Sequence, residues 1–372
     1  MTKHIRLKGL IHKEFLQIWR DPSSLAIAFV LPVFLLLLFG YGVSLDAKHV
    51  PIGWVIEKPT SVTQSFSDSF NRSEYFNPVF FSDMQTAELA LQNKNIHAII
   101  RLRENFSRQF FKPKSAAIQV IVDGVDANTA RLVSGYIQST WIQWLSHQAE
   151  LRGVTLQTPI IVEHRIWYNS ALLSKEYLIP GLIAVIMTLI GALLTALVFA
   201  REWERGTMEA LLATPISAKE ILLGKLIPYY LLGMGGLLLS IAMAVFLFQV
   251  PLRGSLWVLL LTGSLFLFVA LGMGLLISIV AKNQFVAGQI AIIVTFLPAF
   301  ILSGFIFDIS SMPTAIQLLT HLIGARYFVA ILQTVFLTGN VWTVILPNAL
   351  ALLIMVFIFF ALAVRKAPRN LE

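Results

Sequence analysis

Charged residues of alternating sign gather in one short segment of a chain that is otherwise poor in charge. Residues 201–212 read Arg-Glu-Trp-Glu-Arg-Gly-Thr-Met-Glu-Ala-Leu-Leu. Opposite charges lie three or four residues apart in the pairs Arg201/Glu204, Glu202/Arg205 and Arg205/Glu209. Such spacings make side chains neighbours on a helix, so we expect a short helix with a self-compensating charge network. Gly206 allows a break, and Thr207 can cap the helical turn after it. Two interpretations stay open: a solvated link between two spans, or a rigid lever that a partner pushes.

No other pattern in the sequence indicates catalysis or metal binding. The sequence has no cysteine and no G-x-x-x-x-G-K-[ST] phosphate loop, H-E-x-x-H motif or His/Asp cluster. A Ser/His/Asp combination could be chosen from the chain, but no nucleophile motif surrounds any serine. We therefore predict no catalytic residue, no metal site and no ATPase site in this chain.

The composition is that of an integral membrane protein. Hydrophobic residues make up 57% of the chain and charged residues only 13%, about half the share in soluble proteins. Six runs contain no Asp, Glu, Lys or Arg: Pro22–Leu45, Tyr177–Ala200, Leu226–Leu252, Gly254–Ala281, Asn283–Phe307 and Tyr327–Val364. A span needs about 20 apolar residues. Five runs fit one helix each, and Gly339-Asn340 divides the sixth so that Val341–Val364 is the span.

The basic residues of the short loops predict the orientation. One side of the membrane collects Lys3, Arg6, Lys8, Lys13, Arg20, Arg201, Arg205, Lys219, Lys225, Lys282, Arg365, Lys366 and Arg369. The other short loops contain only Arg253 and Arg326. By the positive-inside rule both termini are cytoplasmic. The net charge of +8 then reflects topology, which argues against a nucleic-acid partner.

The spans themselves contain no fixed charge. Ion-coupled carriers place ionisable groups inside spans, so we expect an external energy source. Aromatic residues in the spans form a candidate translocation path for an apolar or amphipathic cargo: Phe34, Phe39, Tyr41, Tyr229, Tyr230, Phe296 and Phe300. Such residues more often pack or face lipid, so this assignment is an expectation only.

The region before the first span, residues 1–24, predicts an amphipathic helix over residues 4–20 that lies on the cytoplasmic membrane surface. Asp21-Pro22 ends it, and Ser23 or Ser24 can cap the first span, residues 25–45. In the third span Ser217-x-x-Glu220 is a capping-box pattern, and Gly233, Gly235 and Gly236 allow close helix packing.

Residues 46–176 predict an external α/β domain inserted after the first span. The predicted strands are Ile52–Ile56, Val79–Phe81, His97–Leu102, Ala117–Val122 and Ile160–Trp167, and the predicted helices lie near Ser61–Phe70, Thr86–Gln92, Asn105–Phe110 and Ala127–Leu151. In residues 177–372, five further spans follow. Residues 303–338, interrupted by Asp308, Pro313, Gly324 and Arg326, predict an external re-entrant hairpin.

Several segments together resemble type-2 ABC exporter permeases, in particular the drug-exporter branch of bacterial ABC transporter membrane subunits. The segment 201–212 carries the resemblance, with Leu-Leu-Ala-Thr-Pro-Ile after it and Lys225 in the next helix. Further similar segments are Lys13-Glu14 with Arg20-Asp21-Pro22, Phe39-Gly40-Tyr41-Gly42, and Leu302-Ser303-Gly304 leading into Met312-Pro313. The resemblance covers essentially the whole chain.

The resemblance implies specific roles. Residues 4–20, with Lys13, Glu14, Arg20 and Asp21, match the connecting helix. Residues 201–212 match the coupling helix that contacts the ATPase, through Arg201, Glu202, Glu204, Arg205, Gly206, Thr207 and Glu209. The fold class is thus an α-helical polytopic membrane protein with six transmembrane helices, a re-entrant external hairpin and an inserted periplasmic α/β domain.

The implied partners are a cytoplasmic ABC ATPase dimer, which carries ATP and Mg, a second identical or related permease, a periplasmic adaptor protein and membrane lipid. The implied location is the bacterial inner membrane. A lipid or glycolipid exporter of the same family is an alternative. A membrane-anchored sensor or scaffold, or an intramembrane enzyme, would come from other classes. The six spans without an intramembrane charge argue against the first, and the lack of polar catalytic residues in the spans argues against the second.

Overall fold

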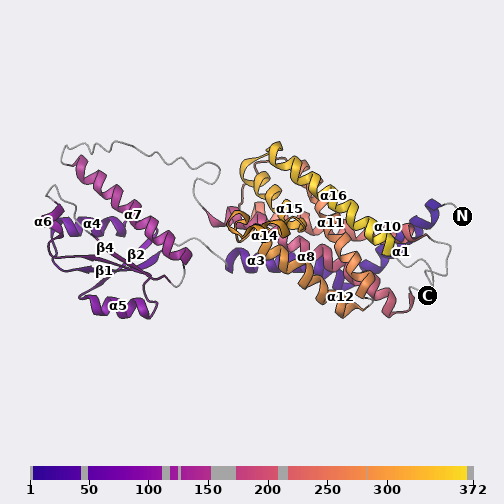
Figure 1. The fold of residues 1–372 in the computed structure, drawn as a ribbon, viewed down its shortest axis with the longest axis horizontal. Helices are drawn as coiled ribbons and strands as arrows, with labels where there is room; N and C mark the ends of the chain where they lie inside the picture. Colours follow the sequence, from indigo (N-terminus) through magenta and orange to yellow (C-terminus); the bar gives the residue numbers. More distant parts are fainter. Residues whose placement is uncertain are drawn as a thin grey trace. The chain divides into compact units, whose positions relative to one another are not determined.

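The computed structural model describes residues 3–42, 49–110, 118–124, 127–151, 173–207, 217–281 and 283–366. The chain divides into two compact units, one made of Met1–Ser44 with Ile166–Glu372 and the other of Leu45–Arg165. The first unit is helical and the second contains a four-stranded sheet (Figure 1).

Among the described residues of the first unit, six helical segments are long and apolar enough to cross a membrane, in agreement with the six predicted spans. They are Pro22–Gly42, Ser174–Glu204, Glu220–Leu247, Leu256–Ala281, Gln284–Leu302 and Trp342–Lys366. In order, they comprise α2 (Pro22–Leu25) with α3 (Leu31–Gly42), α8 (Ser174–Glu204), α10 (Ala218–Ala242), α11 (Leu256–Ala281), α12 (Gln284–Ala291) with α13 (Leu297–Leu302), and α16 (Trp342–Lys366). Single π-helical turns, Ala26–Val30, Met243–Leu247 and Ile292–Phe296, interrupt or extend three of them.

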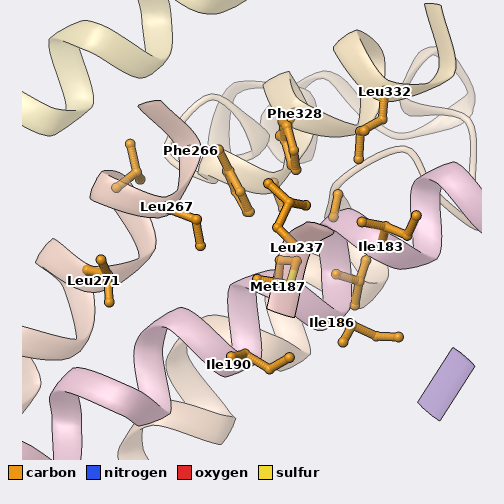
Figure 2. Packing of buried hydrophobic residues seen from close by; sticks show 14 of the residues in the cluster. Ile183, Ile186, Met187, Ile190, Leu237, Phe266, Leu267, Leu271, Phe328 and Leu332 are labelled. Carbon is orange, nitrogen blue, oxygen red and sulfur yellow. The ribbon is translucent and has the colours of Figure 1, made fainter. Parts of the chain in front are cut away.

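Helix α8 lies at the centre of this unit. Of its most apolar stretch 88% is buried, against 11% for α16. Figure 2 shows Ile183, Met187 and Ile190 of α8 among side chains of neighbouring helices, including Phe266 and Phe328. These two rings stack with centroids 4.2 Å apart. A helix that is apolar on all sides and buried by protein fixes the positions of the helices around it.

Small residues bring α8 and α11 into close contact. Gly274 of α11 lies against the backbone of Ala192, and the Thr195 hydroxyl donates to the Leu271 carbonyl at 2.8 Å. The predicted glycines of α10 also pack closely: Gly236 lies against the Ala28 carbonyl of the first span. Such contacts bring backbones together where lipid supplies no hydrophobic driving force.

A sharp bend separates the fifth and sixth spans. After a 3₁₀ turn, Ile309–Ser311, helix α14 (Thr314–Thr320) meets the helix made of α15 (Gly324–Gln333) and the turn Thr334–Thr338 at 85°. In Figure 1, α14 lies at the end of the helical unit opposite α1 (Lys3–Trp19). The broken geometry agrees with a segment that turns back, and its re-entrant course in a membrane stays a prediction.

The second unit is an α/β fold. Its sheet has the order β2-β1-β3-β4, with β1 (Val50–Ile56) parallel to β2 (Phe76–Phe81) and to β3 (Ala98–Leu102), and β4 (Gln119–Val122) antiparallel to β3. Its helices are α4 (Ser61–Asn71), α5 (Met84–Gln92), α6 (Phe106–Phe110) and α7 (Ala127–Glu150). Strand residues alternate between two cores: Trp54 packs with Phe66 and Trp144 on the α4–α7 side, and Val55 packs with Ala87 of α5 on the other.

The strands predicted at Ile52–Ile56, Val79–Phe81, His97–Leu102 and Ala117–Val122 coincide with β1 to β4, although Ala117 itself is not described. The strand predicted at Ile160–Trp167 lies outside the described residues.

The capping of the first span differs from expectation, because the Asp21 carboxylate caps it and accepts hydrogen bonds from Ser23 and Ser24. A carboxylate is the stronger acceptor for the free N–H groups of a helix start.

Candidate functional site

Four charged side chains from three helices meet at one end of the helical unit. The Lys225 ammonium of α10 lies 2.9 Å from the Glu14 carboxylate of α1 and 2.9 Å from the Glu202 carboxylate of α8. Lys13 reaches the same two carboxylates, at 3.3 and 3.1 Å. We call Lys13, Glu14, Glu202 and Lys225 the charge cluster; its formal charges sum to zero.

The cluster is shielded from solvent. The side chains of Glu14, Glu202 and Lys225 are at most 4% exposed, whereas that of Lys13 is 47% exposed. Burial lowers the pKa of Lys13, but the neighbouring Glu14 and Glu202 carboxylates outweigh it and raise the pKa above its ordinary value. Because a buried charge without a partner is very costly, the four groups hold α1, α8 and α10 together only as a complete set.

A second ion pair joins the start of the first span to the end of α8. The Arg201 guanidinium donates to the Asp21 carboxylate at 2.5 Å, and both side chains are at most 16% exposed. Burial opposes ionisation of Asp21, but hydrogen bonds from Ser23, Ser24 and Arg201 outweigh it and hold the pKa well below its ordinary value. Asp21 therefore caps the first span and anchors α8 at the same time.

The last residue of α8 holds the start of the fifth span. Glu204 accepts a hydrogen bond from the Gln284 backbone N–H at 2.9 Å and another from its side-chain amide at 2.6 Å. The Gln284 amide oxygen in turn lies 3.4 Å from Arg201 Nε. Gln284 is a site residue that sequence reasoning missed, because no local spacing connects it with Glu204, 80 residues earlier.

The predicted self-compensating helix over 201–212 is wrong in its described part. Residues 201–204 are the last turn of α8, and Arg201 and Glu202 pair with other helices instead of with Glu204 and Arg205. This end of α8 lies beside α1, α10, the start of the first span and the start of α12, and its charges meet partners there. Glu209 and the rest of 208–216 lie outside the described residues.

The chain leaves α8 through an abrupt turn. Arg205 is exposed, and Gly206 adopts a left-handed backbone conformation with φ = 68°, which confirms the predicted break. The Thr207 hydroxyl donates to the Glu202 carboxylate and so ties the turn to the charge cluster.

Helix α1, which contains Lys13 and Glu14 of the predicted connecting residues, packs against α10. Leu10 fits against Gly224, where a Cβ atom would collide with it. The predicted capping box is confirmed, since Ser217 and Glu220 bond reciprocally at the start of α10. Arg20 is exposed, as are Phe15, Leu16 and Trp19. The exposed apolar side chains agree with a helix that rests on a membrane surface.

The predicted path residues do not form one lining. Phe39, Phe296 and Phe300 make one aromatic cluster, with the Phe300 centroid 6.1 and 5.8 Å from the other two. The rest lie apart: Phe34 and Tyr41 are exposed, Tyr229 is buried, and Tyr230 stacks on Phe268. The sequence could not give the rotation of each helix about its axis, on which any such lining depends.

Replacing Asp21 with asparagine tests the link between α8 and the first span. The variant is expected to lose thermal stability at neutral pH because Arg201 keeps its charge without a carboxylate partner. The Asp21 pKa is lowered on folding, so its stabilising effect is fully present above the ordinary value of 3.8 and is lost as the pH falls towards the folded value. The difference in unfolding temperature between wild type and variant should stay constant near neutrality and shrink below about pH 4. A difference that changes between pH 6 and 8 would contradict this assignment.

Comparison with known proteins decides the family. The family model described as ABC-2 family transporter protein matches residues 22–365. The chain belongs to the ABC-2 transporter permease family. Over 368 residues it is 45% identical to the Escherichia coli K12 protein named "Probable multidrug ABC transporter permease YbhS", covering 99% of this chain and 98% of that protein. It is 29% identical over 334 residues to the E. coli K12 protein named "Probable multidrug ABC transporter permease YbhR", and this alignment covers 89% of this chain and 90% of that protein. It is 28% identical over 277 residues to the E. coli K12 protein named "Inner membrane transport permease YhhJ", and this alignment covers 73% of each chain.

The charge cluster is an ionic junction between three helices of this ABC-2 permease. It brings together the connecting-helix residues Lys13 and Glu14, the α8 residue Glu202 and Lys225 of α10. A permease of this family implies a partner subunit that binds ATP. The junction includes Glu202 of the segment 201–212, which the sequence predicts to contact that subunit.

Proposed function

We propose that this permease is the membrane subunit of an exporter that moves apolar or amphipathic drugs out of the cytoplasm or the inner leaflet. Energy comes from ATP hydrolysis on a separate subunit, and this chain has no ATPase site of its own. The observation that carries the proposal is the junction itself: the end of α8 is tied to α1 and α10 by four charges, three of them buried. The name of the E. coli relative supports drugs as the cargo.

The junction supports a lever mechanism. Closure of an ATPase dimer would push the predicted coupling segment 201–212, and Gly206 lets the chain turn sharply at the end of α8. Because Glu202 binds both α1 and α10, the push would move three helices as one body. Nucleotide binding drives transport only if it favours one of the two states of the bundle.

The proposed complex contains two permeases, identical or related, and an ATPase dimer in the bacterial inner membrane. Both termini and the charge cluster face the cytoplasm, as the distribution of Lys and Arg between loops supports. The α/β unit then lies in the periplasm, where it can dock an adaptor protein. The bent segment Ser303–Thr338 lies at the external surface.

Replacing Glu204 with lysine tests the coupling role. The change removes the two hydrogen bonds to Gln284 and places a cation beside Arg201. We expect drug efflux to fall at least about tenfold, equivalent to about 1.4 kcal/mol of coupling, while membrane insertion is unchanged. Efflux of a fluorescent apolar drug from cells, and ATP hydrolysis by the complex purified through a tag on the permease, are the two measurements.

Glu176 supplies the matched control, because it lies in the first turn of the same helix. Glu176→Lys should retain efflux close to wild type. Normal efflux in Glu204→Lys, with the ATPase still co-purifying, would disprove the lever.

The cargo class needs a separate measurement. Vesicles that contain the purified complex would be supplied with ATP and either an apolar dye or a fluorescent phospholipid. Transport of the dye supports the proposal, whereas movement of the lipid alone would favour a lipid or glycolipid exporter. ATP-independent ligand binding by a complex that transports neither would favour a sensor or scaffold.

A further inference from the structure

An apolar cavity of about 290 Å³ lies inside the helical unit. Its walls come from α8, α11, the fifth span and the bend between α14 and α15, with Thr188, Met273, Thr295 and Gly324 among the lining residues. None of the aromatic residues predicted to form a path is among the described residues that line it. The cavity therefore needs an explanation of its own.

The cavity offers its occupant no free polar group among the described lining side chains. Its two hydroxyls are already bonded within their own helices: Thr188 donates to the Ala184 carbonyl at 2.8 Å, and Thr295 to the Ala291 carbonyl at 2.6 Å. The other lining side chains are apolar. A cavity of this kind excludes water and accepts hydrocarbon.

The lining of the cavity extends along two of the spans. On α11 its lining runs from Phe266 to Met273, and on the fifth span from Val294 to Leu302. The seven and eight helical rises between the ends of these two ranges correspond to about 10–12 Å, roughly a third of the hydrocarbon thickness. One wall opens towards the outside of the unit, because Val294, Leu319 and Leu322 are 51%, 55% and 71% exposed.

A cation lies beside the mouth of the cavity. The Arg326 guanidinium contacts the last turn of α14, where it donates to the Gln317 carbonyl at 3.2 Å and to the Thr320 hydroxyl and lies 3.0 Å from His321 Nδ1. Leu319 and Leu322 of the cavity wall flank Thr320 and His321 in the sequence. Within the described part of the chain, Arg326 forms no ion pair with a carboxylate.

We propose that this cavity holds an acyl chain of a phospholipid from the outer leaflet, and that Arg326 binds the phosphate of its headgroup. The depth of the cavity, its apolar walls and its open side fit a hydrocarbon chain entering from the bilayer. A guanidinium at the mouth without a carboxylate partner fits the anion. The bound lipid stabilises the 85° bend by filling the space between it and the spans. The site is separate from the proposed cargo and from the charge cluster.

The test measures lipid binding to the purified full-length permease by native mass spectrometry. The probes are phosphatidylglycerol and phosphatidylcholine with identical acyl chains, and inorganic phosphate as a competitor. Wild type should bind one phosphatidylglycerol per chain, about tenfold more tightly than phosphatidylcholine. Arg326→Gln should abolish this preference, whereas Arg253→Gln, which changes an exposed arginine elsewhere, should keep it.

A second pair of variants tests the cavity without changing any charge. Val294→Trp, which places a large ring at the open wall, should lose both lipids. Ile293→Trp should retain them, since Ile293 is similarly exposed, at 63%, but does not line the cavity. Equal binding by both tryptophan variants, an unchanged preference in Arg326→Gln, or displacement of the lipid by equimolar phosphate would overturn the proposal. So would a Val294→Trp variant that changes only the number of permease copies in the complex, because the open wall would then be a contact between copies.

Discussion

Replacing Lys225 with methionine is expected to cost about 3–5 kcal/mol of folding stability and to reduce drug efflux to background. Lys225 is the buried cation of the charge cluster, and its removal leaves Glu14 and Glu202 to share the half-exposed Lys13. The negative charges of two carboxylates that are at most 4% exposed would then be only partly neutralised inside the protein. Thermal unfolding of the solubilised protein and efflux from cells are the measurements.

The double variant Glu202→Gln with Lys225→Met separates stability from transmission of force. It removes one charge of each sign, so that Lys13 and Glu14 remain as a neutral pair 3.3 Å apart. Much of the stability lost in either single variant should return, because no excess charge stays buried. Efflux should stay low, because α8 and α10 are no longer joined by an ion pair.

The control for both variants is Lys8→Met, which removes an exposed lysine from the same helix as Lys13. Its stability and efflux should match wild type, since exposed charges contribute little. If the double variant transported drugs normally, the charge cluster would serve folding alone.

The architecture could be predicted because its signals are local. Runs without charge define six spans, and three of them coincide with helices to within a few residues, such as Gly254–Ala281 with α11 (Leu256–Ala281). In the α/β unit, short runs of β-branched and aromatic residues predict strands, as for Ile52–Ile56 within β1. Each of these signals depends on a window of residues that folds as one element.

The site could be predicted only in part because its contacts are not local. Spacing pairs Glu202 with Arg205, yet Glu202 binds Lys225 and Lys13, which are 23 and 189 residues away in the chain. Helical spacing shows which side chains of one helix lie close enough to pair with each other. Tertiary packing decides whether those pairs form or whether the charges pair with other helices instead. An isolated lysine in an apolar run, as in Leu222-Leu-Gly-Lys225-Leu, does indicate that a buried partner must exist, but it does not identify the partner.

Replacing Gly274 with alanine is expected to destabilise the bundle, although alanine favours a helix over glycine by about 1 kcal/mol. A Cβ atom at Gly274 would collide with the Ala192 carbonyl oxygen and the Thr195 hydroxyl, and would lie 2.8 Å from the Ala192 carbonyl carbon. Backbone atoms cannot rotate away, so α11 must move from α8. Overpacking of this kind costs about 1–3 kcal/mol or more.

The loss should include the hydrogen bond from Thr195 to the Leu271 carbonyl, which crosses the same contact at 2.8 Å. A larger side chain, as in Gly274→Leu, should prevent accumulation of folded protein, because α8 is the helix on which the other spans pack. Unfolding temperature of the solubilised permease, and its yield from membranes, measure the effect.

Gly288→Ala is the matched control, because the nearest side-chain atom to its new Cβ is at an ordinary 3.8 Å. In α12 the alanine should be neutral or stabilising by up to about 1 kcal/mol. The two variants make the same chemical change in two helices of one unit, so their opposite signs would isolate the contact between α8 and α11. Equal unfolding temperatures for the two variants would show that these helices pack less closely than the structure places them.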